Sequence, residues 1–415
     1  MTGGLEQPPE PSGRWRQLAI LAVGLLLVEA PWMSAAAVAP LLQLEWQTTG
    51  LDLPLLTVAV QLGFAAGALA LAIGGVPDVV PAPRLFAAGA VVAAAGNLGF
   101  ALSATDSITA LPYRAVTGAG IAAAYPLAMK LAAGWFTRGR GLAIGVLIGA
   151  LTVGTALPYL FRALGAYAGL EWRPIALAAT PVALAGGLIV LALARPGPLD
   201  VPAPRFSLSI AAAAFRSPSV RLANLGYLGH MWELYAMWTW IPMFLLASFG
   251  AAGLADAAAG SLAAFAVVAA GGIGCIAAGA VADRVGRTTV TIAAMGLSAS
   301  SAIVAGLLFG APVPLVVAVA IVWGVTVVAD SAQFSTAVSE LAPPGTAGSA
   351  LAVQTATGFL LTGVTMLGIG LLAPDGADGW RLAWGLLALG PIVGIAAMWR
   401  LRRRPDAVRM ANGRR

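Results

Sequence analysis

Long apolar stretches alternate with short charged or Pro/Gly-rich turns along almost the whole chain. Apolar residues make up 60% of the 415 residues and the mean hydropathy is +0.89, whereas soluble domains contain about 45–50% apolar residues. A helix needs roughly 20 apolar residues to cross the hydrocarbon layer of a bilayer, which is about 30 Å thick. We therefore expect twelve membrane crossings, at 17–43, 53–76, 85–104, 107–134, 141–165, 172–194, 219–248, 257–281, 289–310, 313–337, 347–373 and 380–399.

These stretches predict helices rather than strands. They show no alternation of apolar and polar residues with a period of two, which a membrane barrel requires, and membrane helices tolerate the Gly and Pro residues inside them. The first stretch follows Arg14 and Arg16 and contains Ala35-Ala36-Ala37, so it imitates a secretory signal peptide. It is too long for one, and too many crossings follow, so we expect an all-α polytopic membrane protein.

Arginines predict the orientation, because short cytoplasmic loops carry an excess of Lys and Arg. With a cytoplasmic N-terminus, the even-numbered turns and the C-terminal tail contain most of the arginines, while the opposite turns contain only Arg162, Arg173 and Arg381. We expect both termini to be cytoplasmic. Arg outnumbers Lys 22 to 1, which suggests a GC-rich bacterial genome and hence the cytoplasmic (inner) membrane of a bacterium.

The longest polar connection, from Arg195 to Pro218, divides the crossings six and six. It predicts two six-helix bundles related by pseudo-twofold symmetry, as repeats in transporters often are. The expected regions are a cytoplasmic N-terminal tail (1–16), an N-terminal bundle (17–194), a cytoplasmic inter-bundle loop (195–218), a C-terminal bundle (219–399) and a basic cytoplasmic tail (400–415).

Several classes of function lack support in the residues. Cys275 is the only cysteine and His230 the only histidine, so no intrachain disulfide, metal-ligand cluster or nucleophile–base motif is expected. The net charge of +6 follows from the topology and from contact with anionic lipid at the cytoplasmic face, so we expect no nucleic-acid partner. We predict a monomer that is not an enzyme and has no cofactor and no bound metal.

Two motifs resemble those of the major facilitator superfamily. The turn Gly279-Ala280-Val281-Ala282-Asp283-Arg284-Val285-Gly286-Arg287 resembles its loop signature, and Arg114-Ala115-Val116-Thr117-Gly118-Ala119-Gly120 fits its Arg-x-x-x-Gly-x-Gly pattern. The second stretch looks most like organic-anion/proton symporters. This resemblance implies secondary transport by alternating access of the two bundles.

The resemblance also implies a gating role for the turn from Gly279 to Arg287. In the superfamily this element braces its helix pair against the start of the eleventh helix, which would place Asp283 near the free N–H groups at about Gly345 to Ser349. Arg284 and Arg287 would pair with that acid or with lipid phosphate, beside Gly279 and Gly286 as the turn glycines. The matching turn in the first half keeps Asp78 but lacks the Gly-Arg pair.

Four ionisable residues are expected inside the membrane, where charged side chains are costly and mark functional sites. At about 1.5 Å per residue, their distances from the nearest charged ends place all four at roughly 15–20 Å above the inner edge. They fall on crossings one, four, seven and ten, which line the central cavity in the superfamily: Glu29, Arg114, Glu233 and Asp330.

Helical spacing suggests neighbours for these four groups in an aromatic cavity. They are expected to come from Trp32, Tyr125, His230, Tyr235, Trp323, Gln333 and Gln354. His230 is either a hydrogen-bonded core residue or, one turn from Glu233, a group that shares a proton with it. Gln354 either joins helices together or contacts the ligand.

Three negative charges and one positive charge at one level predict that a carboxyl group is protonated, paired with Arg114 or neutralised by a bound cation. We hypothesise proton-coupled symport of a small organic solute into the cell, because the fifth crossing lacks the Gly-Pro pair of proton-antiporting exporters in the superfamily. Nitrate porters share the general plan, but their signatures are absent. The alternatives are a proton-antiport exporter of cationic amphipathic compounds and, more remotely, a transporter-shaped sensor without transport.

Overall fold

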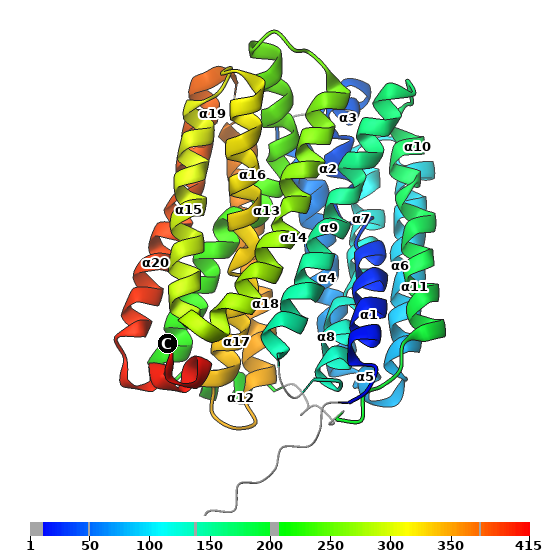
Figure 1. Cartoon of the computed structure of the whole chain (residues 1–415). Coiled ribbons are helices and arrows are strands. Elements are labelled where there is room, and N and C mark those ends of the chain that lie inside the picture. Colours follow the sequence, from blue (N-terminus) through cyan, green and yellow to red (C-terminus); the bar gives the residue numbers. More distant parts are fainter. Residues whose placement is uncertain (1–10, 49, 137–138, 200–206, 373–374) are drawn as a thin grey trace, which may run out of the picture.

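The computed structural model describes residues 11–48, 50–136, 139–199, 207–372 and 375–415 (Figure 1). All regular structure in these residues is helical. Eleven of the helices, where adjoining segments are counted together, are long and apolar enough to cross a membrane. The predicted all-α fold with twelve crossings in two bundles is confirmed.

The first half of the chain forms eleven helical segments. They are α1 (Arg14–Val28), α2 (Ser34–Ala37), α3 (Ala39–Trp46), α4 (Asp52–Ile73), α5 (Val76–Val79), α6 (Ala82–Ser103), α7 (Ser107–Ile121), α8 (Tyr125–Ala133), α9 (Arg140–Tyr167), α10 (Trp172–Leu177) and α11 (Ala179–Leu193). At the start of α7, Thr109 N–H donates a 2.8 Å hydrogen bond to the Asp106 carboxylate, which caps the helix and lowers the pKa of that carboxyl group.

The second half continues with a short connecting helix and the remaining crossings. They are α12 (Leu208–Ala214), α13 (Pro218–Ala251), α14 (Ala257–Val285), α15 (Arg287–Leu307), α16 (Val313–Ala329), α17 (Ser331–Leu341), α18 (Ala347–Leu372), α19 (Gly376–Leu387), α20 (Leu389–Arg402) and the 3₁₀ segment η1 (Pro405–Gly413). In Figure 1 the two halves lie side by side, with α9 and α14 next to each other between them.

The first crossing is broken, which is why it is absent from the eleven long helices. α1 ends at Val28, residues 29–33 form turns, and α2 and α3 complete the crossing. Pro31 lies within the break, and proline lacks the N–H that a continuous helix needs at that position. Non-helical backbone at membrane depth must be buried in protein or line a cavity, so the break marks a place where other helices supply hydrogen bonds.

Small residues bring the two bundles close together along α9 and α14. A Cβ built on Gly145 would lie 2.7 Å from the Cys275 carbonyl oxygen, and one on Gly149 would lie 2.9 Å from that of Gly272. Helix packing in membranes depends on such close approach. On the other side of the molecule, α4 meets α18, where the Thr362 hydroxyl donates a 2.8 Å hydrogen bond to Gln61 Oε1.

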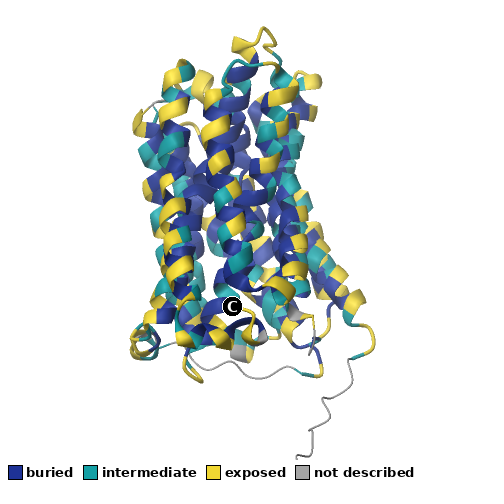
Figure 2. Cartoon of the chain, turned by 60° about the vertical axis from the view of Figure 1, so that its left-hand side comes forward, coloured by how far each residue is buried: buried dark blue, intermediate teal, exposed yellow. Residues whose placement is uncertain are grey.

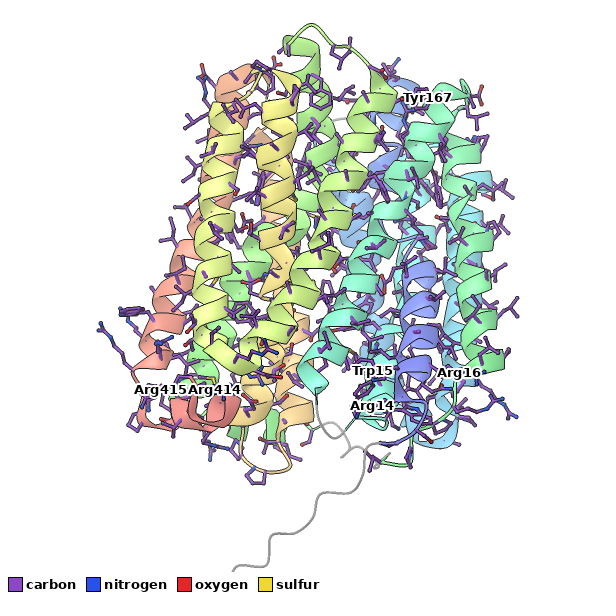
Figure 3. The ribbon with its side chains drawn as sticks, viewed as in Figure 1. Arg14, Trp15, Arg16, Tyr167, Arg414 and Arg415 are labelled. Atoms are coloured by element: carbon purple, nitrogen blue, oxygen red, sulfur yellow. The ribbon has the colours of Figure 1, made fainter. Side chains whose placement is uncertain are left out.

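The two ends of the molecule differ in charge. Arg14, Arg16, Arg414 and Arg415 lie at one end, which we call the basic end, while Tyr167 lies at the other (Figure 3). Buried residues fill the centre of the molecule, and exposed ones lie on its outer surfaces and ends (Figure 2). The cytoplasmic placement of the basic end and the proposed region boundaries stay predictions.

Candidate functional site

A cavity of about 70 Å³ lies near the middle of the crossings, between the two bundles. It has room for a few water molecules or a small solute. Both bundles contribute to its wall, and seven of its sixteen lining residues are aromatic. The lining residues are Glu29, Trp32, Phe64, Tyr125, Ile148, Leu151, Tyr227, Met231, Leu234, Tyr235, Trp238, Val328, Ser331, Ser335, Thr355 and Phe359.

Glu29 provides the only charged side chain in this wall. It caps the end of α1 at the break of the first crossing, is 1% exposed, and its Oε1 atom has no hydrogen-bond partner among the described residues. A Cβ built on Gly154 of α9 would lie 2.9 Å from the Glu29 Cβ, so the absence of a side chain there makes room for the glutamate. The phenols of Tyr125 and Tyr235, one from each bundle, line the same cavity.

Aromatic rings connect the two bundles beside Glu29. The Trp32 ring lies 5.8 Å from that of Tyr235 and 5.8 Å from that of Phe359. The Phe64 ring lies 5.1 Å from that of Phe359, and Tyr235 packs 5.2 Å from Trp238. These are favourable separations for aromatic pairs, and every pair except the last joins one bundle to the other.

Arg114 lies at the break of the first crossing and not in the cavity wall. It is 0% exposed, and its two Nη atoms donate hydrogen bonds to the carbonyl oxygens of Pro31 and Trp32 and to the Ser34 hydroxyl. Its guanidinium also lies 5.2 Å from the centre of the Phe100 ring. Arg114 therefore donates to two backbone carbonyls at the break, of which that of Pro31 also accepts from Ser34, and it holds the turn that carries Glu29.

A buried polar network extends this support through the first bundle. The Ser34 hydroxyl donates a 2.7 Å hydrogen bond to Asn97 Oδ1 on α6. The Asn97 amide donates to the Ala176 carbonyl at 2.8 Å and to the Thr180 hydroxyl at 3.0 Å. The network thus joins the break in the first crossing to the junction of α10 and α11.

The other predicted membrane carboxylates lie in the interior of the second bundle. Glu233 accepts hydrogen bonds from Trp323 Nε1 at 2.6 Å and from the Ser298 hydroxyl at 2.8 Å. Asp330 sits at the junction of α16 and α17, where its Oδ1 lies 2.9 Å from His230 Nδ1, and both side chains are 1% exposed. Neither carboxylate lines the cavity. The side chains beside them belong to the second bundle: Trp323 and Ser298 for Glu233, and His230 for Asp330.

The face of α13 that borders the cavity is not the one suggested by helical spacing from Glu233. The cavity wall takes from this helix Tyr227, Met231, Leu234, Tyr235 and Trp238. His230 and Glu233 point into the second bundle instead. Between Met231 and Trp240, every residue of α13 except Glu233 and Thr239 is apolar or aromatic, so the sequence does not distinguish the two faces of this stretch.

The charged turn forms an ion-pair cluster at the basic end. Arg287 Nε and Nη2 each donate a 2.7 Å hydrogen bond to one oxygen of Glu340, a bidentate geometry. Nη2 also lies 3.3 Å from the Asp283 carboxylate, and Nη1 donates at 3.0 Å to Gln333 Oε1. Gln333, expected near the solute, is therefore part of this cluster. Arg284 is exposed.

The expected partner of Asp283 needs correction. Its Oδ2 would lie 2.9 Å from a Cβ on Gly141 at the start of α9, whereas Cβ atoms on Gly345 and Gly348 would meet nothing within 4 Å. The carboxylate thus faces the helix that begins in the first bundle, not the start of α18, because α14 packs across the interface on α9. A Cβ on Gly279 would lie 2.7 Å from the Gly141 carbonyl oxygen. The side chain of Asp78 lies outside the described part of the structure.

The end of the chain packs on the same cluster. Ala407 and Met410 are buried, Ala411 N–H donates to Glu340 Oε2 at 3.2 Å, and Arg414 Nη1 donates to the Asp283 carbonyl at 2.7 Å. We call residues 405–415 the docked tail. Gly286 has a φ of +97°, and a Cβ there would overlap with the carbonyl oxygens of Arg414 and Arg415.

Gly286→Ala is therefore expected to release the docked tail as well as to strain the turn, because a positive φ costs a residue with a Cβ about 1–3 kcal/mol. Trypsin cleavage after Arg409 should become faster. Gly253→Ala is the matched control, since Gly253 has a φ of +87° and a Cβ there would meet nothing within 4 Å. Equal cleavage rates in the two variants would contradict the role assigned to Gly286.

The structure brings some predicted site residues together and separates others. Glu29, Trp32, Tyr125 and Tyr235 meet in the cavity. Trp323 bonds Glu233 away from it, and Gln354 is 0% exposed with neither amide atom bonded among the described residues. Sequence reasoning missed Tyr227, Phe64 and Phe359 as lining residues. The position of Tyr227, one turn before His230 on α13, could have identified it. Nothing in the apolar stretches of α4 and α18 distinguished the two phenylalanines from their neighbours.

A larger groove, of about 520 Å³, lies on the outside of the first bundle between α6 and α11. Its wall is apolar except for Arg84, and both helices lie on the far side from the second bundle in Figure 1. The groove is therefore part of the surface that faces lipid, and the cavity between the bundles is the candidate solute site.

Two bundles of membrane helices that enclose a small polar and aromatic cavity midway across define a secondary transporter. The profile of the Major Facilitator Superfamily matches residues 21–360. The chain belongs to the major facilitator superfamily. No match was found among curated protein sequences.

Solved structures agree with this assignment of the fold. The chain is similar to the xylose transporter XylE from E. coli in a partially occluded inward-open conformation, with 14% identity, a TM-score of 0.73, and coverage of 94% of this chain and 98% of that one. It is also similar to the nucleoside transporter NupG, with 17% identity, a TM-score of 0.70, and coverage of 94% and 99%. A structure described as the proton:xylose symporter XylE bound to 6-bromo-6-deoxy-D-glucose gives 14% identity, a TM-score of 0.71, and coverage of 94% and 96%.

Proposed function

We propose that this transporter couples the movement of a small organic solute to protons, and that Glu29 is the carboxyl group that binds and releases the proton. The observation that carries the proposal is the position of Glu29, which is buried in the cavity wall with an oxygen atom that has no partner among the described residues. A buried carboxylate without a partner is strongly destabilising. Glu29 must therefore be protonated or paired with a bound cation whenever the cavity is closed to water.

The contacts of the bundles suggest how access to Glu29 alternates. The α9–α14 seam and the α4–α18 contact lie on opposite sides of the molecule, and each must loosen for the cavity to open. Glu29 faces residues of both bundles, so the environment of its carboxyl group changes when the bundles separate. Proton coupling in the proton:xylose symporter, a protein of the same fold, supports this proposal. His230 with Asp330, and Glu233, already have neighbours in the second bundle and are the less suitable carriers.

The test is solute-driven proton movement in proteoliposomes that contain a pH-sensitive dye. Small amines, carboxylic acids and sugars are added outside, and internal pH is recorded. Wild type should respond to at least one class, and Glu29→Gln should abolish the response because glutamine cannot exchange a proton. Acidification of the interior indicates symport, as predicted for uptake, and alkalinisation indicates antiport.

Glu45→Gln is the matched control, because Glu45 belongs to the same crossing but lies at its outer end with a side chain that is 47% exposed. It should respond as wild type does. An unchanged response in Glu29→Gln would refute the proposal and would indicate that a carboxyl group of the second bundle carries the proton.

A further inference from the structure

The charge and the surface of the cavity wall together indicate a class of solute. We infer that the cavity binds the ammonium group of a small organic cation, which competes with a proton for Glu29; this inference rests on the proposed function. It differs from the organic anion suggested by the sequence motifs, and it depends on three features of the cavity.

The first feature is the balance of charge. Glu29 is the one charged residue among those that line the cavity, and no arginine, lysine or histidine accompanies it there. Arg114, expected to hold an anionic solute, directs its Nη atoms to the backbone and to Ser34. An anion would therefore enter a buried site that already holds a carboxyl group and has no cation to compensate it. An ammonium group would compensate the carboxylate directly.

The second feature is the aromatic wall. Trp32 and Tyr235, from different bundles, line the cavity together with Glu29, and the Phe359 ring lies 5.4 Å from that of Tyr235. A cation over an aromatic face gains about 0.5–2 kcal/mol, most where water is excluded. A carboxylate gains nothing comparable from the negative face of a ring. The carboxyl group and the rings thus both favour a positively charged solute.

The third feature is a pair of unused donors. The indole N–H groups of Trp32 and Trp238 are buried in the wall without a partner among the described residues. A buried donor without an acceptor is costly, so a solute that reaches either N–H gains affinity if it carries an oxygen acceptor as well as its ammonium group. At about 70 Å³, the cavity in this structure admits only a small molecule or the head of a larger one.

Competition follows from the groups around Glu29. The other ionisable side chains that line the cavity are the phenols of Tyr125 from α8 and of Tyr227 and Tyr235 from α13, while α9 contributes Gly154 beside Glu29, and α4 and α18 contribute Phe64 and Phe359. No second carboxylate is present in the wall to take the proton that the solute displaces. One carboxyl group that binds either a proton or an ammonium group exchanges the two, which makes proton antiport the expected mode for such a solute.

Isothermal titration calorimetry of the purified protein tests this inference with three probes of one shape. Benzylamine, benzyl alcohol and benzoate share a ring and differ in charge. Benzylamine should bind most tightly, and more tightly at about pH 7.5 than at about pH 5.5, with a change of up to about tenfold per pH unit where one proton competes. Glu29→Gln should weaken benzylamine at least about thirtyfold and remove the pH dependence, whereas Glu45→Gln should leave both unchanged.

Tighter binding of benzoate, equal binding of benzyl alcohol and benzylamine, or no binding of benzylamine at millimolar concentration would overturn the inference. The proposed function is judged separately by proton movement. If Glu29→Gln abolishes solute-driven proton movement while the protein prefers a neutral or anionic probe, only the inference fails. If benzylamine binds through Glu29 and no solute moves protons, only the proposed function fails.

Discussion

Arg114→Ala is expected to lower the free energy of unfolding by about 1–3 kcal/mol, since a buried carbonyl left without a donor costs about that much. This carbonyl is that of Trp32, because the Pro31 carbonyl keeps the N–H and the hydroxyl of Ser34 as donors. Its loss of a donor should also release the turn that carries Glu29, so that solute-driven proton movement fails although Glu29 itself is intact. Thermal unfolding in detergent measures the first effect and the proteoliposome assay the second.

Arg173→Ala is the matched control for this experiment. Arg173 also donates to two carbonyl oxygens, those of Ala101 and Ala104, and also lies over an aromatic ring, that of Trp172. Its side chain is 34% exposed, so water can replace its hydrogen bonds and the loss should stay below about 1 kcal/mol. Arg114→Lys should recover part of the stability but not the forked geometry. Equal destabilisation of the two alanine variants would exclude the bracing role.

Gly118→Ala is expected to destabilise the protein although it adds only a single carbon atom. A Cβ at Gly118 on α7 would overlap with the carbonyl oxygen of Val60 on α4, and would lie 2.8 Å from Phe64 N. Backbone atoms cannot move aside as a flexible side chain does, so the two helices must separate. Such overpacking typically costs about 1–3 kcal/mol, and Phe64, which lines the cavity, moves with α4.

The measurement is the thermal unfolding midpoint of Gly118→Ala beside that of Gly250→Ala. A Cβ on Gly250 in α13 would meet nothing within 4 Å, and replacing a helical glycine by alanine then stabilises by up to about 1 kcal/mol. The two variants should thus shift in opposite directions. A Gly118→Ala protein as stable as wild type would show that the Arg-x-x-x-Gly-x-Gly pattern does not serve close packing here.

Arg114 has a different role in the structure from the one that its motif suggests. In the sequence, an arginine midway across the membrane is a candidate for binding an anionic solute or for making a neighbouring carboxyl group release its proton. In the structure its two Nη atoms donate hydrogen bonds to the broken first crossing. The sequence pattern does not reveal that break, since Pro31 is tolerated within membrane helices. We therefore propose Glu29 and the rings around it, rather than Arg114, as the groups that bind the solute.

The sequence alone determined the number of crossings and the helical class, because these depend on local properties. Bilayer thickness sets the length of each apolar stretch, and a charge is costly wherever it lies along that length. The charged turn was also recognisable in the sequence. That its Asp283 faces α9, and not the start of α18, was not.

Only the tertiary structure decided which side of each helix meets which neighbour. Glu29 and Glu233 look alike in the sequence, as acids midway along apolar stretches, yet one lines the cavity without a partner and the other is bonded to Trp323 and Ser298. In water, the polar face of a helix points outward and reveals its orientation. In a membrane bundle both the lipid-facing and the buried sides are apolar, so packing between helices decides the orientation of each side chain.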